Sequence, residues 1–251
     1  MARKSTPTLE VKNLKKSFLV GNEEIPVLKG LNLEVGFGEF VVILGPSGCG
    51  KSTLLNTILG LEEPSEGQVL VRGEDIYKMD EDGRAHFRRQ KFGVVYQQPN
   101  WIKALNVIEN VAFPLNIAGV RQQEAIKRAR NILYLFKFDS FAKYYPMELS
   151  GGQQQKLSMC RALISNPWII MADEPTGNLD TVTAEDLMYD LKVLNSESKR
   201  TIVMVTHNPE YERYATKIVY MEDGNIKKIV QKEKPAIASG EEVVDLAGEV
   251  F

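Results

Sequence analysis

Phe40-Val41-Val42-Ile43-Leu44-Gly45-Pro46-Ser47-Gly48-Cys49-Gly50-Lys51-Ser52 is the stretch of sequence that decides the fold of this chain. Phe40–Leu44 is entirely apolar, which is typical of a strand buried on both faces of a parallel sheet. Gly45–Ser52 then matches the pattern G-x-x-x-x-G-K-[ST] without departure. A helix is expected over Lys51–Leu59. The motif therefore has the strand before it and the helix after it that distinguish a phosphate-binding loop from a chance Gly-rich turn.

The residue types of this loop suit ATP with Mg²⁺. Glycines let the backbone approach closely, so that amide N–H groups and the positive end of the helix meet the phosphate oxygens. Lys51 is expected to reach the β and γ phosphates, Ser52 to reach Mg²⁺, and Thr53 to reach the α phosphate. The expected nucleotide ligands from this loop are Gly45, Pro46, Ser47, Gly48, Cys49, Gly50, Lys51, Ser52 and Thr53.

A second strand pattern ends in two acids, in the string Ile169-Ile170-Met171-Ala172-Asp173-Glu174. Ligands bind at the carboxyl ends of parallel strands. Asp173 is therefore expected to hold Mg²⁺, directly or through its water, and Glu174 to polarise the attacking water. Phosphoryl transfer needs mainly positioning and neutralisation of charge, so these two acids suffice. The alternative is that Asp173 and Glu174 are simply solvated acids at a strand end. The presence of a phosphate loop in the same chain makes this alternative the weaker one.

A second helix start rich in glycine lies about a hundred residues downstream, in Leu149-Ser150-Gly151-Gly152-Gln153. Ser150 is a good N-cap, and the helix is expected to run to about Asn166, before Pro167. A helix start of this kind is another anion site. The chain therefore has two phosphate-seeking helix starts, and a single nucleotide does not obviously need both.

The remaining patterns predict an α/β fold. Alternating apolar residues predict antiparallel strands in two N-terminal stretches and at Gln68–Val71, while continuous apolar runs predict parallel strands. Buried strands are expected at 40–44, 93–96, 169–172 and 202–206, and helices at 51–59, 121–136 and 183–194. A helical subdomain is expected over about 99–162. The ATPase domain is expected over 1–230 and a loosely held tail over 231–251.

Composition limits the possible functions. Lys and Arg (31) nearly balance Asp and Glu (33), so there is no overall basic field for non-specific nucleic-acid binding. Apolar runs are much shorter than the roughly 18–20 residues of a membrane helix, and the polar residues after Met1 lead us to expect no signal peptide. Any membrane role is therefore expected to come through a partner. Cys49 is open to two interpretations, a reactive thiol or a small filler, and the filler is favoured.

The order of these motifs resembles that of ABC-type ATPases over about residues 8–230. Leu149–Gln153 resembles the signature motif of that family, Gln97 the Q-loop, and Asp180 the D-loop. His207 resembles the switch histidine, and Phe18 the aromatic residue on which adenine stacks. Taken alone, His207 would be an ordinary residue at a strand end, and for Phe18 simple core packing is the less favoured alternative. The string Asp173–Asp180 is similar to the macrolide-exporter and lipoprotein-release branch of the family.

The resemblance implies a P-loop (recA-like) parallel sheet core, an antiparallel β subdomain and an inserted helical subdomain. It also implies head-to-tail pairs of ATPase subunits, with each ATP between the Lys51 loop of one subunit and Ser150, Gly151, Gly152 and Gln153 of the other. Gln97 would sense Mg²⁺ and water, His207 would hold the γ phosphate and orient Glu174, and Asp180 would contact the partner's phosphate loop. The implied catalytic residues are Glu174, His207, Gln97 and Lys51, and the implied metal ligands are Ser52, Gln97 and Asp173.

The same resemblance implies a cytoplasmic subunit on the inner face of the cell membrane. It would drive export, lipoprotein extraction or mechanical transmission by a separate transmembrane subunit of permease type. One alternative is a soluble ABC-type ATPase acting on nucleic acid or the ribosome, but no paired cassette, coiled coil or zinc module is visible. The other is a non-catalytic nucleotide-gated module, but Glu174 and His207 are both present. The segment Gln98–Leu105 departs from the usual pattern of the family, and Lys156 stands in a position where Arg is more usual.

Overall fold

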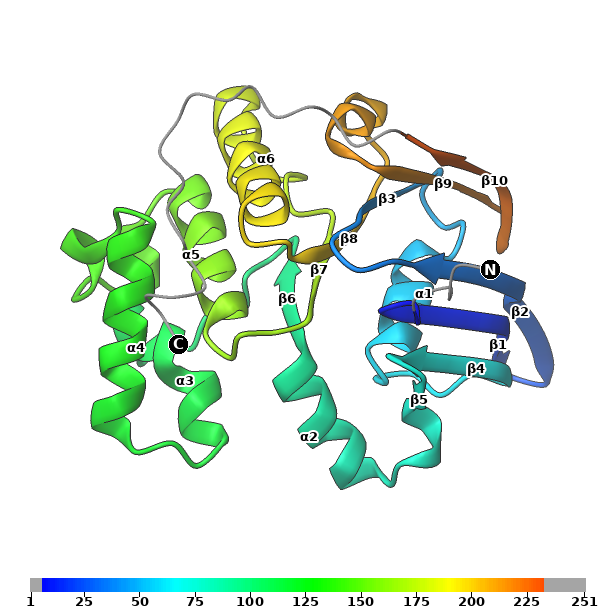
Figure 1. Cartoon of the computed structure of the whole chain (residues 1–251), viewed down its shortest axis with the longest axis horizontal. Coiled ribbons are helices and arrows are strands. Elements are labelled where there is room, and N and C mark those ends of the chain that lie inside the picture. The colour runs from blue at the N-terminus through cyan, green and yellow to red at the C-terminus, as the bar shows by residue number, and fades with distance from the viewer. Residues whose placement is uncertain (1–5, 233–251) are drawn as a thin grey trace. The chain divides into compact units, whose positions relative to one another are not determined.

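The computed structural model describes residues 6–232 of the 251-residue chain. These residues form two compact units (Figure 1). The first unit comprises the described residues up to Arg88 and from Thr201 onward, and the second comprises Arg89–Arg200. Within residues 6–232, no helix is both long and apolar enough to cross a lipid bilayer.

The first unit contains an antiparallel sheet in the strand order β2-β1-β4-β5. Apolar residues alternate along its strands, so that Leu9, Val11 and Leu14 of β1 are buried while their neighbours face outward. Its strands are β1 (Leu9–Val20), β2 (Glu23–Val35), β4 (Glu66–Val71) and β5 (Glu74–Asp75), followed by the short helix η1 (Ile76–Lys78). The predicted antiparallel strands are confirmed.

The first unit also contains four strands in the order β10-β9-β3-β8. β3 pairs in parallel with both β8 and β9, and β10 closes the edge in antiparallel orientation. Every residue of β3 and β8 is buried, as their continuous apolar sequences predict. The elements are β3 (Phe40–Leu44), α1 (Lys51–Ile58), β8 (Thr201–Thr206), η4 (Pro209–Tyr214), β9 (Lys217–Glu222) and β10 (Asn225–Gln231).

The second unit combines two parallel strands with helices. β6 (Phe92–Tyr96) pairs with β7 (Ile169–Asp173), and three helices, α3, α4 and α5, pack against one another (Figure 1). α2 (Glu81–Lys91) belongs to the first unit up to Arg88, and its last residues, from Arg89 on, belong to the second. The helices of this unit are α3 (Val107–Ile117), α4 (Gln122–Leu135), η2 (Asp139–Phe141), η3 (Pro146–Glu148), α5 (Gly151–Leu163) and α6 (Thr181–Ser196).

Two of the predicted helices, now α5 and α6, have wrong ends. α5 ends at Leu163 and not near Asn166, because Asn166 has a left-handed φ of 52° and donates its N–H to Leu163 O at 2.9 Å. Pro167 disfavours helical backbone in the residue before it, which explains the early stop. α6 begins at Thr181, two residues before the predicted Thr183, because Asp180 caps it. The predicted 99–162 subdomain and the tail from 231 stay predictions, and residues 233–251 lie outside the described residues.

Candidate functional site

The predicted phosphate loop connects β3 to α1 in the first unit. Lys51, which is 7% exposed, donates from Nζ to the carbonyl oxygens of Gly45 at 2.7 Å and Pro46 at 3.0 Å. Its ammonium group therefore lies inside the curl of the loop, at the point where the chain turns from strand to helix. Gly50 adopts the left-handed conformation with φ 99° and leaves the start of α1 without a side-chain cap. The loop thus combines a buried cation with an uncapped helix N-terminus, and both attract an anion.

Close packing explains Gly45 in the loop and brings Gly224, a glycine outside the loop, against it. A Cβ atom on Gly45 would overlap the carbonyl oxygen of Met221 and would lie 2.7 Å from Cys49 Sγ. Gly224, in the turn between β9 and β10, donates its N–H to Cys49 O at 3.1 Å and accepts from Lys29 N at 2.9 Å. Cys49 is buried at 4% exposure, as expected of the filler interpretation. The turn at Gly224 is a support for the loop that the sequence did not reveal.

His207 and Phe18 lie in the same unit as the loop. Leu44 is in register with Thr206, so Gly45 and His207 leave the sheet from the carboxyl ends of neighbouring parallel strands. His207 is exposed there. Phe18 lies on β1, is 37% exposed and has Lys16 Nζ 4.9 Å from its ring centroid. The ring is too exposed for the simple core alternative.

The second unit brings Gln97 to the predicted acids. Tyr96 is in register with Asp173, so Gln97 and Glu174 follow at the carboxyl ends of adjacent parallel strands. The Gln97 amide also lies against the loop after Glu174. A Cβ atom added to Gly177 in that loop would come 2.7 Å from Gln97 Nε2. Glu174 has a left-handed φ of 45° and accepts from Gly177 N at 3.0 Å. Left-handed backbone in a residue other than glycine is strained, and such strain concentrates at functional sites.

The predicted signature helix α5 starts with a capping box. Ser150 Oγ accepts from Gln153 N at 3.3 Å, and Gln153 Oε1 accepts from Ser150 N at 2.9 Å. Further along the helix, the buried Gln155 donates from Nε2 to Tyr96 O at 2.8 Å. Gln155 therefore connects the signature helix to the strand that ends next to Gln97.

The segment after Gln97 is also anchored to α5. Arg161 donates to the carbonyl oxygens of Pro99 and Asn100, and its guanidinium carbon lies 4.4 Å from the centroid of the Trp101 ring. Burial lowers the pKa of Arg161 to about 10, which still leaves it charged at neutral pH. Trp101 is half-buried beneath this cation. Arg161 thus holds the part of the chain whose sequence departs most from the family pattern.

Asp180 lies at the start of α6, opposite the signature motif. Its carboxylate accepts from Thr183 N at 3.0 Å and from Thr183 Oγ1 at 2.7 Å. Those bonds, the backbone one first, hold the pKa of Asp180 below its usual range, so it is ionised at neutral pH. Thr183 also packs on Gly152, where a Cβ atom would overlap the Thr183 methyl group.

The structure places the predicted residues in two groups. Phe18, Gly45–Thr53 and His207 belong to the first unit, and Gln97, Ser150–Gln153, Asp173, Glu174 and Asp180 belong to the second. Sequence reasoning missed four supporting residues: Gly224, Gln155, Arg161 and Thr183. Of these, only Thr183 carries a usable signal, since it is the third residue after an Asp that caps a helix.

A matched pair of glycine variants tests the contact between α5 and α6. Gly152→Ala is expected to lower the free energy of unfolding by about 1–3 kcal/mol, because overpacking exceeds the smaller gain in helix propensity. The melting temperature should fall by about 2–4 °C for each kcal/mol. Thermal unfolding followed by circular dichroism measures the change.

The control is Gly151→Ala, because a Cβ atom there meets nothing within 4 Å. It is expected to unfold at or slightly above the wild-type temperature. Gly152→Ala combined with Thr183→Ser should regain most of the lost stability, since the overlapping methyl group is gone. A Gly152→Ala variant as stable as Gly151→Ala would contradict the packing described here.

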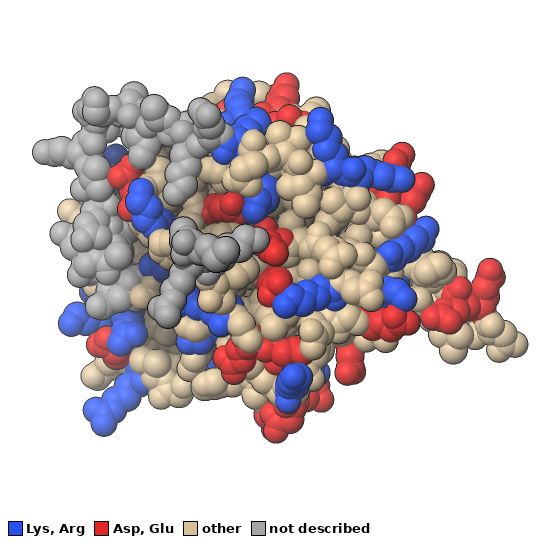
Figure 2. All heavy atoms as spheres, turned by 45° about the vertical axis from the view of Figure 1, so that its right-hand side comes forward, with Lys and Arg blue, Asp and Glu red and all other residues tan. Residues whose placement is uncertain are grey.

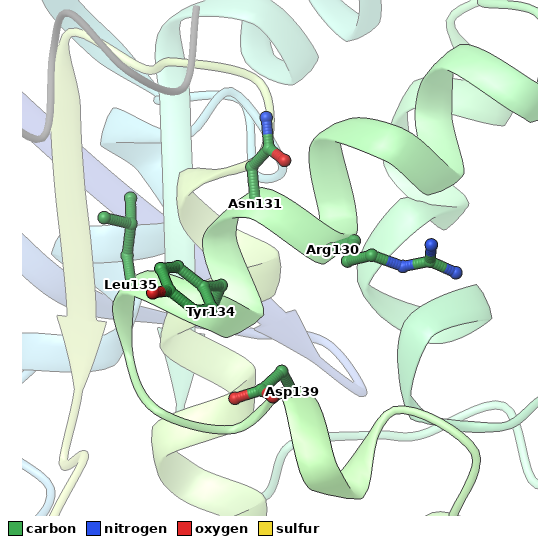
Figure 3. Close-up of a pocket in the computed structure, with 5 residues that line it drawn as sticks. All are labelled: Arg130, Asn131, Tyr134, Leu135 and Asp139. Atoms are coloured by element: carbon green, nitrogen blue, oxygen red, sulfur yellow. The ribbon is translucent and has the colours of Figure 1, made fainter.

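A separate concavity of about 600 Å³ lies on α4 and η2. It is lined by Arg130, Asn131, Tyr134, Leu135 and Asp139. Figure 3 shows Asn131 and Arg130 pointing away from Tyr134 and Asp139, so that no common point for a ligand is formed. None of the predicted site residues lines it, and we assign no function to it.

The strand–loop–helix at Gly45–Ser52 and the acid-ended strand β7, within an α/β fold, define the class as a P-loop ATPase. A family model described as "ABC transporter" matches residues 28–177. The chain therefore belongs to the ABC transporter family, and it is an ATP-binding cassette with ATPase activity.

Individual relatives agree with this. The chain is 44% identical over 224 residues to the uncharacterized ABC transporter ATP-binding protein MJ1508 of Methanocaldococcus jannaschii, covering 89% of this chain and 100% of that protein. It is 38% identical to the macrolide export ATP-binding/permease protein MacB of Escherichia coli K12, covering 88% of this chain but only 34% of MacB.

Solved structures extend the similarity to the fold. A dimeric structure of MJ0796, described as a bacterial ABC transporter cassette, matches with a TM-score of 0.83 and 41% identity, covering 90% of this chain and 99% of that chain. A dimeric post-hydrolysis state of MJ0796 bound to ADP and Pi has the same TM-score of 0.83. The predicted fold class and family are confirmed.

Proposed function

We propose that this chain is the ATP-hydrolysing subunit of a membrane complex and that it works as a head-to-tail pair. The observation that carries the proposal is the presence of two phosphate-type helix starts, at Gly50 in the first unit and at Ser150 in the second. In the pair, each ATP lies between the Lys51 loop of one subunit and Ser150–Gln153 of the other. ATP binding closes the pair, and hydrolysis opens it. The dimeric MJ0796 cassettes support this arrangement.

Each predicted site residue then has a role. Lys51 and the amides of the loop hold the phosphates, Phe18 stacks on adenine, and His207 holds the γ phosphate and orients Glu174. Glu174 accepts the proton of the attacking water. Gln97 positions that water and links the site to the helical subdomain. From the other subunit, Ser150 and the Gly152 amide contact the γ phosphate, and Asp180 contacts the phosphate loop. The positions of Gln97 and Glu174 at adjacent strand ends support this assignment.

The residues fit Mg²⁺. Ser52, Gln97 and Asp173 offer a hydroxyl, an amide and a carboxylate oxygen, and hard oxygen ligands are those that Mg²⁺ prefers. Within residues 6–232, no cluster of three or more His, Cys, Asp or Glu side chains could enclose a metal ion. A donor set this sparse suits an ion that arrives with phosphates and keeps several of its waters. When bound, Mg²⁺ neutralises charge on the β and γ phosphates.

A separate transmembrane subunit completes the complex in this proposal. The name of MacB joins an ATP-binding and a permease function in one protein, and this chain spans 34% of it. In this proposal the chain lies at the inner face of the cell membrane, where it drives export, lipoprotein extraction or mechanical transmission. Residues 1–230 form the ATPase domain, with a helical subdomain at about 99–162 that faces the membrane subunit.

Charge does not favour the alternative of a nucleic-acid partner. The formal net charge is −2, and Figure 2 shows acidic and basic side chains interspersed over the visible face of the described residues. Nucleic-acid binding relies on clustered positive charge. A ribosomal or nucleic-acid target is therefore the weaker candidate.

Co-purification tests the membrane assignment. The Glu174→Gln variant, tagged and expressed in its source cells, is expected to retain a protein with several membrane spans from detergent-solubilised membranes when ATP is present. Mass spectrometry identifies the retained protein, and the same variant carrying Lys51→Ala is the control without nucleotide. Retention of ribosomes or nucleic acid, with no membrane protein, would support the alternative function.

A further inference from the structure

Thr183, in the first turn of α6, contacts two of the proposed site elements through the two branches of its side chain. Its hydroxyl donates to Asp180 Oδ2 at 2.7 Å, while its backbone N–H donates to Asp180 Oδ1 at 3.0 Å. Its methyl group covers Gly152, so closely that a Cβ atom there would overlap it. One side chain therefore touches both the D-loop aspartate and the signature motif.

We infer that Thr183 is a positioning residue that fixes Asp180 relative to the signature motif within one subunit. The inference rests on the proposed function, in which Asp180 contacts the phosphate loop of the partner and Ser150–Gly152 contact the ATP that this loop holds. Two groups that act together on another subunit gain from being held in one geometry before the subunits meet, because less ordering is then needed on association.

The stiffness of threonine makes this link effective. A β-branched side chain in a helix has few χ1 rotamers. A rotation that moved the methyl group away from Gly152 would also move the hydroxyl away from Asp180. A displacement of the signature motif at Gly152 is therefore transmitted to the Asp180 carboxylate rather than absorbed by Thr183.

A second contact joins the same two helices further along. Lys156 of α5 lies with Nζ 3.2 Å from Asp190 Oδ2 and 3.7 Å from Asp186 Oδ2, both on α6. The Lys156 and Asp190 side chains are only 22% and 25% exposed, so solvent screens this pair less than a surface pair. α5 and α6 are thus joined at two places. The contact made by Thr183 is the one that involves both the signature motif and Asp180.

Removing only the hydroxyl group tests the inference. Thr183→Val keeps a methyl group against Gly152 and the backbone bond to Asp180 but loses the side-chain bond. We expect kcat for ATP hydrolysis to fall roughly tenfold or more, as the loss of a hydrogen bond to a charged group predicts. ATP binding to the single subunit, measured by calorimetry, should stay unchanged and shows that the variant is folded. Thr181→Val, at an exposed position in the same turn, is the matched control and should hydrolyse ATP as the wild type does.

A double-mutant cycle distinguishes positioning from a general structural role. In the Asp180→Ala background, Thr183→Val should have no further effect on kcat, because the group it positions is gone. Thr183→Ser keeps the hydroxyl and should retain more activity than Thr183→Val. Wild-type kcat in Thr183→Val, an equal loss in the Asp180→Ala background, or a Thr183→Ser variant weaker than Thr183→Val would each overturn the inference.

Ser150→Ala, assayed alongside, separates this failure from a failure of the proposed function. If Ser150→Ala hydrolyses ATP at the wild-type rate, the shared site is wrong, whatever Thr183 does. If Ser150→Ala is impaired and Thr183→Val is not, the shared site stands and the positioning role of Thr183 is wrong.

Discussion

Glu174→Gln is expected to abolish ATP turnover while leaving ATP binding intact. Gln has nearly the shape of Glu but cannot accept the proton of the attacking water. General base catalysis contributes about 10²–10⁴-fold to rates, so a loss of that size in kcat is expected. Binding should change by less than about tenfold, because the phosphates are held by the Lys51 loop in the other unit.

The backbone at this position makes the substitution a clean one. Glu174 has a left-handed φ of 45°, and Gln meets the same steric cost there as Glu. The turn from Glu174 O to Gly177 N involves only backbone atoms and is retained. A change in turnover therefore reports the carboxylate itself and not a rearranged loop.

Phosphate release at saturating ATP measures turnover, and calorimetry with ATP measures binding. Glu81→Gln, at an exposed position in the first turn of α2, is the control for losing one negative charge, and we expect wild-type turnover from it. A Glu174→Gln variant that hydrolyses ATP at the normal rate would remove Glu174 from the role of base. A variant that loses ATP binding as well would show that Glu174 shapes the site instead.

The strands of the site could be predicted because burial alone accounts for their apolar sequences. Phe40–Leu44 and Ile169–Ala172 have no polar residue, which is typical of a strand covered on both faces. Gln97 and His207 are implied only by the resemblance to the family, and the structure places them at strand ends, since Leu44 is opposite Thr206 and Tyr96 is opposite Asp173. Local pattern and global position agree at these points.

The supporting contacts could not be predicted, because they join residues whose types are ordinary. Gln155 and Tyr96 are 59 positions apart, and nothing in a Gln-rich helix start indicates which amide turns inward to a strand. Gly224 is a turn glycine by its sequence, and only the packed structure shows its bonds to Cys49 and Lys29. Such pairings depend on how distant elements pack against one another, which neither propensity nor periodicity encodes.

A mixture of two inactive variants is expected to hydrolyse ATP although neither variant does so alone. Lys51→Ala removes the phosphate-binding cation, and Ser150→Arg blocks the signature motif. Every site in either homodimer then has one defect. In a mixed pair, both defects fall in one site, and the other site combines an intact Lys51 loop with an intact Ser150. Random pairing at equal amounts makes about half of the pairs mixed, so about a quarter of all sites are intact.

The double variant Lys51→Ala/Ser150→Arg provides the converse experiment. In a pair with a wild-type subunit, each site contains one of the two defects, so adding this variant to wild-type protein should lower the activity per wild-type subunit. If each subunit hydrolysed ATP alone, the added double variant would change nothing and the first mixture would stay inactive. The two experiments predict changes in opposite directions, a gain and a loss, so that instability or poor mixing cannot imitate both.

Steady-state phosphate release measures each mixture, and differently tagged subunits verify that mixed pairs form. The buried Lys51 and the exposed Ser150 lie in separate compact units, so either substitution leaves the other group's surroundings intact.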